Sequence, residues 1–147
     1  MFFKSVTDIL TKASNLNEDL AWLLSIDNGV KKEIIKLNTI DQLYEKGIDS
    51  LSDSLGDYSD FTIGLKRQKG QRTDHITLKD TGDFYNSFRV SVTKSAIVIN
   101  ATTQKEDNDL AEQFGQEIIG LTDENLEIIT QMILTNIIKY VKNQLGI

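Results

Sequence analysis

The residues best suited to chemistry are four cations near the middle of the chain. Lys66, Arg67, Lys69 and Arg72 follow one another without an intervening acid. The Gly-Lys-Ser/Thr ending of a phosphate-binding loop is missing from this stretch. The cations could contact phosphate, an acidic protein partner or only solvent. No aromatic residues alternate with them, which argues against stacking on single-stranded nucleic acid.

Groups for catalysis or metal binding are few. The single histidine, His75, follows Asp74 and is expected to be a solvated polar residue. The absence of cysteine removes thiolate nucleophiles and disulfides. Aspartates between 49 and 60 suggest a calcium loop, but neither Asp49 nor Asp53 as first ligand gives the EF-hand spacing. We therefore predict no catalytic residue, no metal site and no cofactor, in a protein that is not an enzyme.

Length and charge set the class of protein. The chain has 147 residues, the size of one domain, and 39% of them are apolar, which suffices for a core. Its net charge is −6, although residues 60–94 hold seven basic residues against four acids. The overall acidity argues against non-specific DNA binding, because the phosphates would repel the protein. Apolar runs are too short to span a membrane and the first residues turn polar too soon for a signal peptide, so we expect no membrane association.

Helical spacing of apolar residues predicts helices over the first 47 residues. Asn17 is expected to cap the second of them, and Lys46-Gly47 to end the third. Residues 48–74 are rich in serine, aspartate and glycine and predict an irregular extended loop. Because apolar residues are too few to hold such a loop, we expect four of them to contact a neighbouring subunit. These candidates are Tyr58, Phe61, Ile63 and Leu65.

Alternation of apolar and polar residues predicts an antiparallel hairpin from Phe88–Val92 and Ala96–Ala101. The final helix, opening at Thr122 and running to about Gln144, is apolar on more than one side. We therefore expect one side to pack on the hairpin and part of the other on a neighbouring subunit or on the N-terminal helices. Met132 and Val141, on the flanks of this helix, are the candidate contacts with a neighbouring subunit. The elements predict one α+β domain over residues 1–147, with N-terminal helices, a small antiparallel sheet including the 88–101 hairpin, and a long C-terminal helix.

The order of features in the second half of the chain is more informative than any single motif. Leu78-Lys79-Asp80-Thr81-Gly82-Asp83-Phe84-Tyr85-Asn86-Ser87-Phe88 precedes the hairpin. A polar loop, Leu110-Ala111-Glu112-Gln113-Phe114-Gly115, Ile118-Ile119-Gly120-Leu121-Thr122-Asp123-Glu124 and the final helix follow it. This order resembles the tail-completion and head–tail joining proteins of tailed bacteriophages, also called the virion morphogenesis family, over roughly residues 75–147. Gln116-Glu117-Ile118-Ile119 replaces the family's basic-proline segment, so no role of that arginine is carried over.

The resemblance implies a structural virion protein. Copies would form a ring in the neck or head-proximal tail, joining the head connector to the tail and surrounding the DNA channel. Implied partners are further copies, other connector and tail proteins, and DNA that passes without specific binding, after assembly in the host bacterial cytoplasm. The alternative, drawn from the cations alone, is a small nucleic-acid-binding or packaging accessory protein that uses the basic loop at 66–72.

Overall fold

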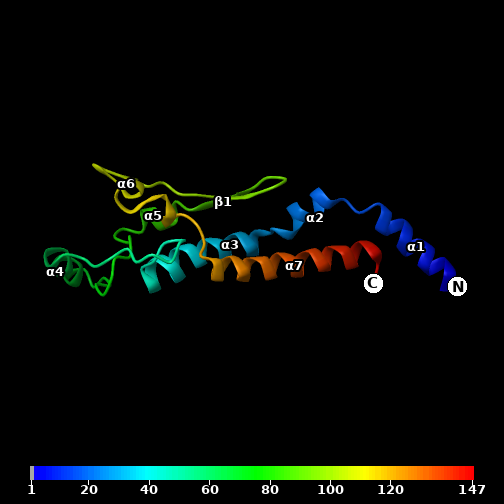
Figure 1. Cartoon of the computed structure of the whole chain (residues 1–147), viewed down its shortest axis with the longest axis horizontal. Coiled ribbons are helices and arrows are strands. Elements are labelled where there is room, and N and C mark those ends of the chain that lie inside the picture. Colours follow the sequence, from blue (N-terminus) through cyan, green and yellow to red (C-terminus); the bar gives the residue numbers. More distant parts are fainter. Residues whose placement is uncertain (1) are drawn as a thin grey trace.

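The computed structural model describes residues 2–147, with side chains from Val6 onward, and the molecule is elongated (Figure 1). Helix α7 (Asp123–Leu145) runs along its length, with α3 (Asn28–Lys36) beside it. The hairpin lies on the far side of α3 from α7 in the same view. Helix α4 (Asp60–Gln68) stands at one end, and α1 (Phe2–Ser14) stands at the other, next to the C-terminal end of α7.

The N-terminal helices follow local capping chemistry. Asn17 caps α2 (Glu18–Ser25) by accepting a hydrogen bond from the backbone of Leu20, as the sequence predicts. Asp27 caps α3 in the same way, by accepting from the backbone of Val30. Helix α3 continues without a break into η1 (Leu37–Lys46), a π-helix. Gly47 then ends it in the left-handed conformation, which confirms that prediction.

The predicted hairpin is confirmed, including its facing. Strand β1 (Arg89–Val92) pairs antiparallel with β2 (Ile97–Asn100), with Val90 opposite Ile99. Val90 and Val92 are half-buried, whereas Arg89 and Ser91 are exposed. The expected polar loop after the hairpin contains a second, very short pair, β3 (Gln104–Lys105) and β4 (Asn108–Asp109).

Short helices link the sheets to α7. They are α5 (Asp83–Asn86), α6 (Leu110–Phe114) and the 3-10 helix η2 (Gln116–Ile118). The Thr122 hydroxyl accepts from the backbone of Asn125 and caps α7, as predicted. The chain is thus an α+β protein dominated by helices, with two small antiparallel sheets and a long C-terminal helix.

The segment from 48 to 74 is not irregular throughout. Residues 60–68 form α4, which begins where the Ser59 hydroxyl accepts from the backbone of Thr62. Backbone hydrogen bonds also tie the segment to its own chain, from Ser50 to Glu117 and from Leu55 to Gly47. The sequence argument counted apolar anchors alone, and therefore missed the polar and backbone contacts that hold this segment.

Two clusters of buried side chains form the core. One lies between α3, α7 and the hairpin, and the other lies around α5, α6 and η1. The first core cluster comprises Ile26, Val30, Ile34, Leu37, Leu121, Ile129 and Ile133. The second core cluster comprises Leu43, Leu78, Phe84, Tyr85, Phe88, Leu110 and Ile118.

Candidate interaction sites

The structure places the four predicted cations on and just after α4, but most are engaged within the chain. The side chain of Lys66 is buried, and its Nζ donates to Gln71 Oε1 at 3.2 Å and to the carbonyl of Lys79 at 3.0 Å. The same ammonium lies 4.8 Å from the ring centre of Tyr58. Lys66 is therefore part of the fold as well as of the basic stretch.

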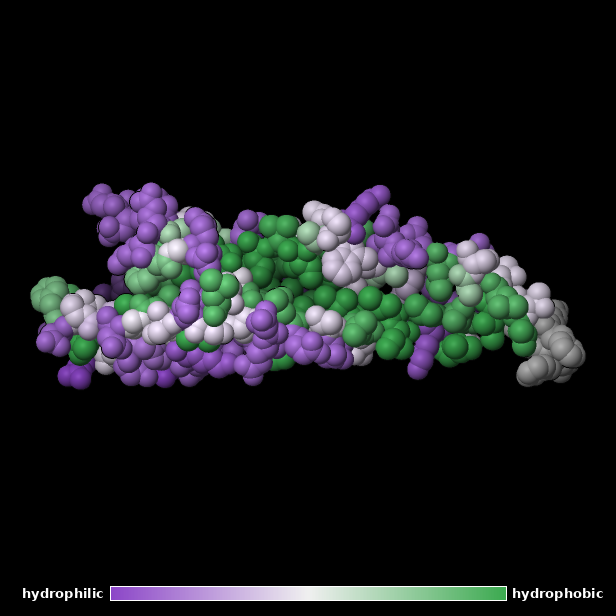
Figure 2. Space-filling model, viewed as in Figure 1, coloured by the Kyte–Doolittle hydropathy of each residue, from purple (hydrophilic) through white to green (hydrophobic). Residues whose placement is uncertain are grey.

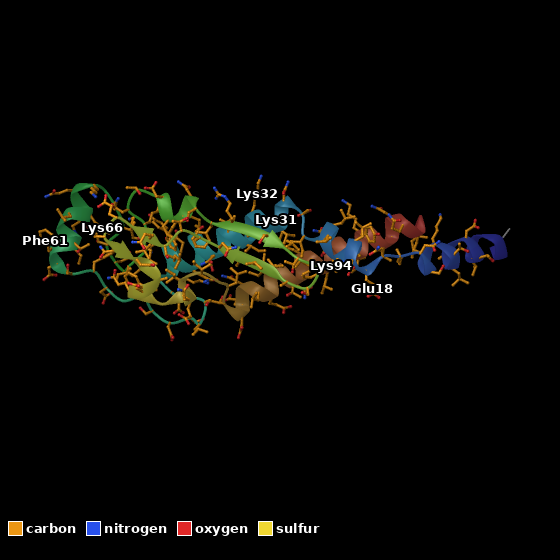
Figure 3. All side chains as sticks on the ribbon, turned by 90° about the horizontal axis from the view of Figure 1, so that it is seen from above. Glu18, Lys31, Lys32, Phe61, Lys66 and Lys94 are labelled. Carbon is orange, nitrogen blue, oxygen red and sulfur yellow. The ribbon has the colours of Figure 1, made fainter. Side chains whose placement is uncertain are left out.

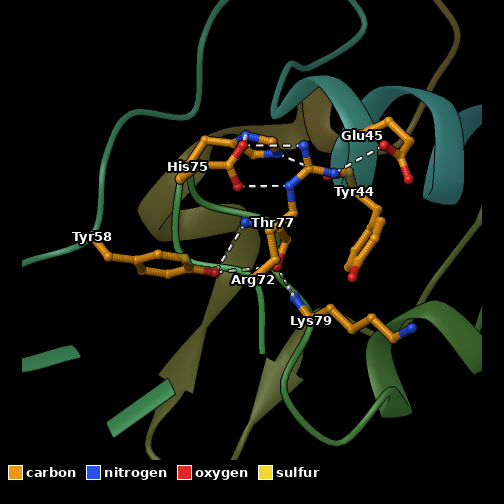
Figure 4. Close-up of polar contacts among 8 residues, drawn as sticks. Tyr44, Glu45, Tyr58, Arg72, His75, Thr77 and Lys79 are labelled. Carbon is orange, nitrogen blue, oxygen red and sulfur yellow. Dashed lines mark hydrogen bonds and ion pairs between the residues drawn. The ribbon is translucent and has the colours of Figure 1, made fainter. Parts of the chain in front are cut away.

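Arg72 is held by two carboxylates (Figure 4). Its guanidinium donates to both oxygens of Asp74, at 2.6 and 3.1 Å, and to Glu45 Oε2 at 2.9 Å. These hydrogen bonds lower the pKa of the Asp74 carboxyl to about 2. Arg72 thus has little free charge to offer an external phosphate.

The remaining two cations, Lys69 and Arg67, differ in whether a carboxylate pairs with them. Lys69 pairs with Asp80 at 3.1 Å, and hydrogen bonds from Lys69 and Gln71 lower the pKa of Asp80. Arg67 is exposed and forms no ion pair within the part of the chain that the structure describes. Among the four predicted contacts, Arg67 is the one left facing solvent without a partner carboxylate.

His75 is not the solvated residue that the sequence suggested. Its side chain is only 16% exposed, and its Nε2 donates to the carbonyl of Tyr44 at 2.7 Å. The ring packs on Gly47, where an added Cβ would lie 2.4 Å from a ring carbon. The prediction failed because Gly47 ends the preceding helix beside His75, a contact between residues far apart in the sequence. His75 stabilises the junction of η1 with the 48–74 segment.

The four predicted subunit anchors on this segment fall into two groups. The Tyr58 hydroxyl accepts from the backbone of Thr77 at 2.9 Å, so this side chain is bound within the chain (Figure 4). Ile63 is half-buried. Phe61 is 77% exposed at the outer end of α4, and Leu65 is also exposed (Figure 3). Phe61 and Leu65 remain available to a partner, whereas Tyr58 does not.

A pocket of about 280 Å³ lies between α4 and the second core cluster. Its lining combines apolar residues with four lysines. Aliphatic lysine stems can cover apolar surface while their charged ends stay in water. Sequence reasoning missed this pocket, because its lining residues come from positions 58 to 114 and meet only in the folded chain.

Apolar side chains are also exposed along the helices that form the other half of the molecule (Figure 2). Met132 itself packs against the first core cluster, and Val141 lines a second pocket, of about 270 Å³, with Trp22 and Ile137. The exposed residues are spread along the three helices α1, α2 and α7. They are Val6, Leu10, Leu20, Leu23, Leu24, Leu126, Ile128, Leu134 and Ile138. We call this set the apolar helix face.

No group of three or more histidine, aspartate or glutamate side chains from Val6 onward is arranged to hold a metal ion. Within the same described part of the chain, no helix is both long and apolar enough to cross a membrane.

Comparisons with known proteins add little to this geometry. No protein-family profile matches the chain, and no solved structure matches it. A ketol-acid reductoisomerase (NADP(+)) from Petrotoga mobilis (strain DSM 10674 / SJ95) is 33% identical over 86 residues. The match covers 54% of this chain and 26% of that enzyme, so the chain spans about a quarter of the length of the curated relative. A match of this extent shows neither the family nor the activity of the chain.

Proposed function

We propose that this chain is a structural subunit of a tailed-bacteriophage virion, forming a ring in the neck or head-proximal tail. In this proposal the ring joins the head connector to the tail and surrounds the DNA channel. The order of features over residues 75–147 suggests the class of protein, and the apolar helix face supports self-assembly. The protein would act mechanically, by association with copies of itself and with other virion proteins.

The observation that carries the proposal is the apolar helix face. Monomeric soluble proteins rarely leave large contiguous apolar patches uncovered, and such patches mark interaction surfaces. Leu10 on α1 is 63% exposed, and Leu134 and Ile138 lie one turn apart on α7. Burying each such side chain contributes roughly 1.5–3 kcal/mol, which is enough to favour association when the contact repeats around a closed ring.

The net charge of −6 suits a protein that surrounds a DNA channel. An acidic lining repels the phosphate backbone, so DNA can pass without being held. The alternative function, nucleic-acid binding through residues 66–72, is less well supported. Lys66 is buried, Lys69 and Arg72 are paired with carboxylates of the same chain, and Arg67 alone of the four is exposed without an ion pair to a described residue.

The proposal is tested by charging the apolar helix face. In the phage that encodes the chain, Leu134→Glu with Ile138→Glu should leave particles without a complete neck. The matched control, Thr130→Glu with Asn143→Glu, adds the same charge at polar exposed positions of α7 and should assemble normally. Electron microscopy would locate the chain in the particle, and circular dichroism would confirm that both variants fold. Normal particles from the Leu134 and Ile138 variant, or absence of the chain from the neck, would refute the proposal.

A further inference from the structure

The lysine-walled pocket beside α4 combines two kinds of lining. Its apolar part is contributed by α4, by the loop before α5, and by α6. These apolar residues are Leu65, Ile76, Leu78, Leu110 and Phe114. A volume of about 280 Å³ lies at the small end of the roughly 300–1,000 Å³ typical of small-molecule sites. The pocket therefore suits one large apolar side chain presented by a partner better than a complete free ligand.

Most of the charged residues in the lining are positive. Lys66, Lys69, Lys79 and Lys105 line the pocket together with one acid, Asp80. Asp80 pairs with Lys69 and also attracts Lys105, whose charge helps to lower the Asp80 pKa. No carboxylate from Val6 onward lies within 4.0 Å of the ammonium groups of Lys66, Lys79 and Lys105. The lining of this apolar pocket therefore holds four lysines and one acid, an excess of positive charge in an acidic chain.

Lys66 is the least expected member of this set. Its side chain is buried, yet within the described part of the chain its ammonium has only the Gln71 amide oxygen, the Lys79 carbonyl and the Tyr58 ring as partners. A buried charge normally requires an opposite charge, since neutral partners replace only part of its lost hydration. An anionic group in the pocket would supply the missing countercharge.

The neighbouring lysine is held in a similar way. The Lys79 ammonium lies 5.1 Å from the ring centre of Tyr44 and 5.7 Å from that of Tyr85, which hold it without neutralising it. Both lysines are therefore positioned by neutral groups, and no carboxylate of the described part of the chain neutralises them within 4.0 Å.

We propose that this pocket docks an acidic segment of a different protein chain. A large apolar side chain of that segment would fill the pocket, and its carboxylates would face Lys66, Lys79 and Lys105. Nucleic acid fits less well, because phosphates gain nothing from the apolar lining. The inference does not depend on ring formation, since the pocket is at the α4 end of the molecule, away from α1 (Figure 1).

The test uses the full-length chain and a fluorescently labelled, amidated peptide. The peptide carries one phenylalanine with two glutamates on each side, and its binding is followed by fluorescence anisotropy. Lys79→Glu with Lys105→Glu should weaken binding at least about tenfold, as should replacing the peptide's phenylalanine by serine. The matched control is Lys31→Glu with Lys32→Glu on α3, which makes the same charge change away from the pocket and should leave the affinity unchanged (Figure 3).

Several results would overturn the proposal. Equal weakening by the α3 variant would indicate non-specific attraction, and equal binding of the serine peptide would exclude the apolar pocket. Saturable competition by duplex DNA at concentrations similar to the peptide would favour the nucleic-acid alternative. Absence of any binding at millimolar peptide would also refute it. Loss of self-association in a Phe61→Ser variant, with unchanged folding, would assign the α4 end to a second copy instead. The peptide and DNA results do not concern the apolar helix face, so the ring proposal is tested separately by its own variants.

Discussion

The side-chain amide of Gln42, in the π-helix η1, forms hydrogen bonds with the backbone of the turn before α7. Gln42 Oε1 accepts from the backbone of Thr122 at 3.0 Å, and its Nε2 donates to the carbonyl of Gly120 at 2.9 Å. Asn38 holds the same turn by donating to the carbonyl of Ile118 at 3.0 Å and accepting from Gly120 N at 2.8 Å. Two buried amides on one helix thereby fix where α7 begins.

This network predicts a large loss of stability when Gln42 is replaced by an apolar residue of similar size. Gln42→Met leaves the buried Thr122 N–H and Gly120 carbonyl without partners and should cost about 2–4 kcal/mol. Gln131→Met, at an exposed position of α7, should change stability by less than about 0.5 kcal/mol. Urea unfolding followed by circular dichroism measures both, and equal stabilities would contradict the role assigned to Gln42.

Charged substitutions at two neighbouring hairpin residues should differ in their cost to stability. Val90 packs against the first core cluster, so Val90→Asp should cost on the order of 2 kcal/mol by placing a charge among apolar side chains. Ser91 faces solvent, and Ser91→Asp should be nearly neutral. Thermal unfolding of the two variants tests this, and a more damaging Ser91 change would mean that the facing is reversed.

The Arg72–Asp74 contact predicts a pH dependence. Asp74 has a lowered pKa of about 2 in the folded chain, so its ionised form favours folding. That contribution is present above the ordinary carboxyl pKa of about 4 and is lost as the pH falls through about 2. Arg72→Gln should raise the Asp74 pKa toward its ordinary value, which carboxyl chemical shifts in an NMR titration would report. An unchanged Asp74 pKa in that variant would show that Arg72 is not the cause.

Replacing Lys66 should affect the stability of the fold and the binding of the acidic peptide differently. Lys66→Met keeps the length of the side chain and removes the buried charge, so stability should stay within about 1 kcal/mol or rise. Binding of the acidic peptide should nevertheless weaken several-fold, because the positive charge of Lys66 that attracts the peptide's carboxylates is gone. Denaturation and anisotropy on the same preparation test both halves, and a strongly destabilised variant would show that the lysine serves the fold alone.

Removing the hydrogen bond at the hairpin tip should loosen the structure only locally. Trp22 Nε1 donates to the carbonyl of Thr93 at 2.7 Å, which ties α2 to the turn between β1 and β2. Trp22→Phe keeps most of the apolar contact and should cost about 0.5–1.5 kcal/mol. Amide hydrogen exchange around Thr93 should become faster while exchange in α7 stays unchanged. Uniform acceleration would indicate that Trp22 supports the whole fold instead.

Local signals in the sequence were sufficient for most of the elements. Asn17 and Thr122 cap helices because their side chains reach backbone donors two or three residues ahead, and Gly47 ends one because it adopts a left-handed conformation. The alternation around Val90 likewise fixes which face of the hairpin is buried. These features depend on neighbours along the chain, so the residues alone predict them.

Contacts between distant residues determined the rest. The cations at 66–72 looked free in the sequence, yet Arg72 meets Glu45 and Lys66 meets Lys79 in the folded chain. Gln42 meets Thr122 across 80 positions of sequence. By itself the sequence determined most of the helices and the 88–101 hairpin, since their caps and alternation depend on residues a few positions apart, although it did not predict α4. Only the tertiary structure decided which charges are paired and where a pocket opens, because both depend on how those elements pack.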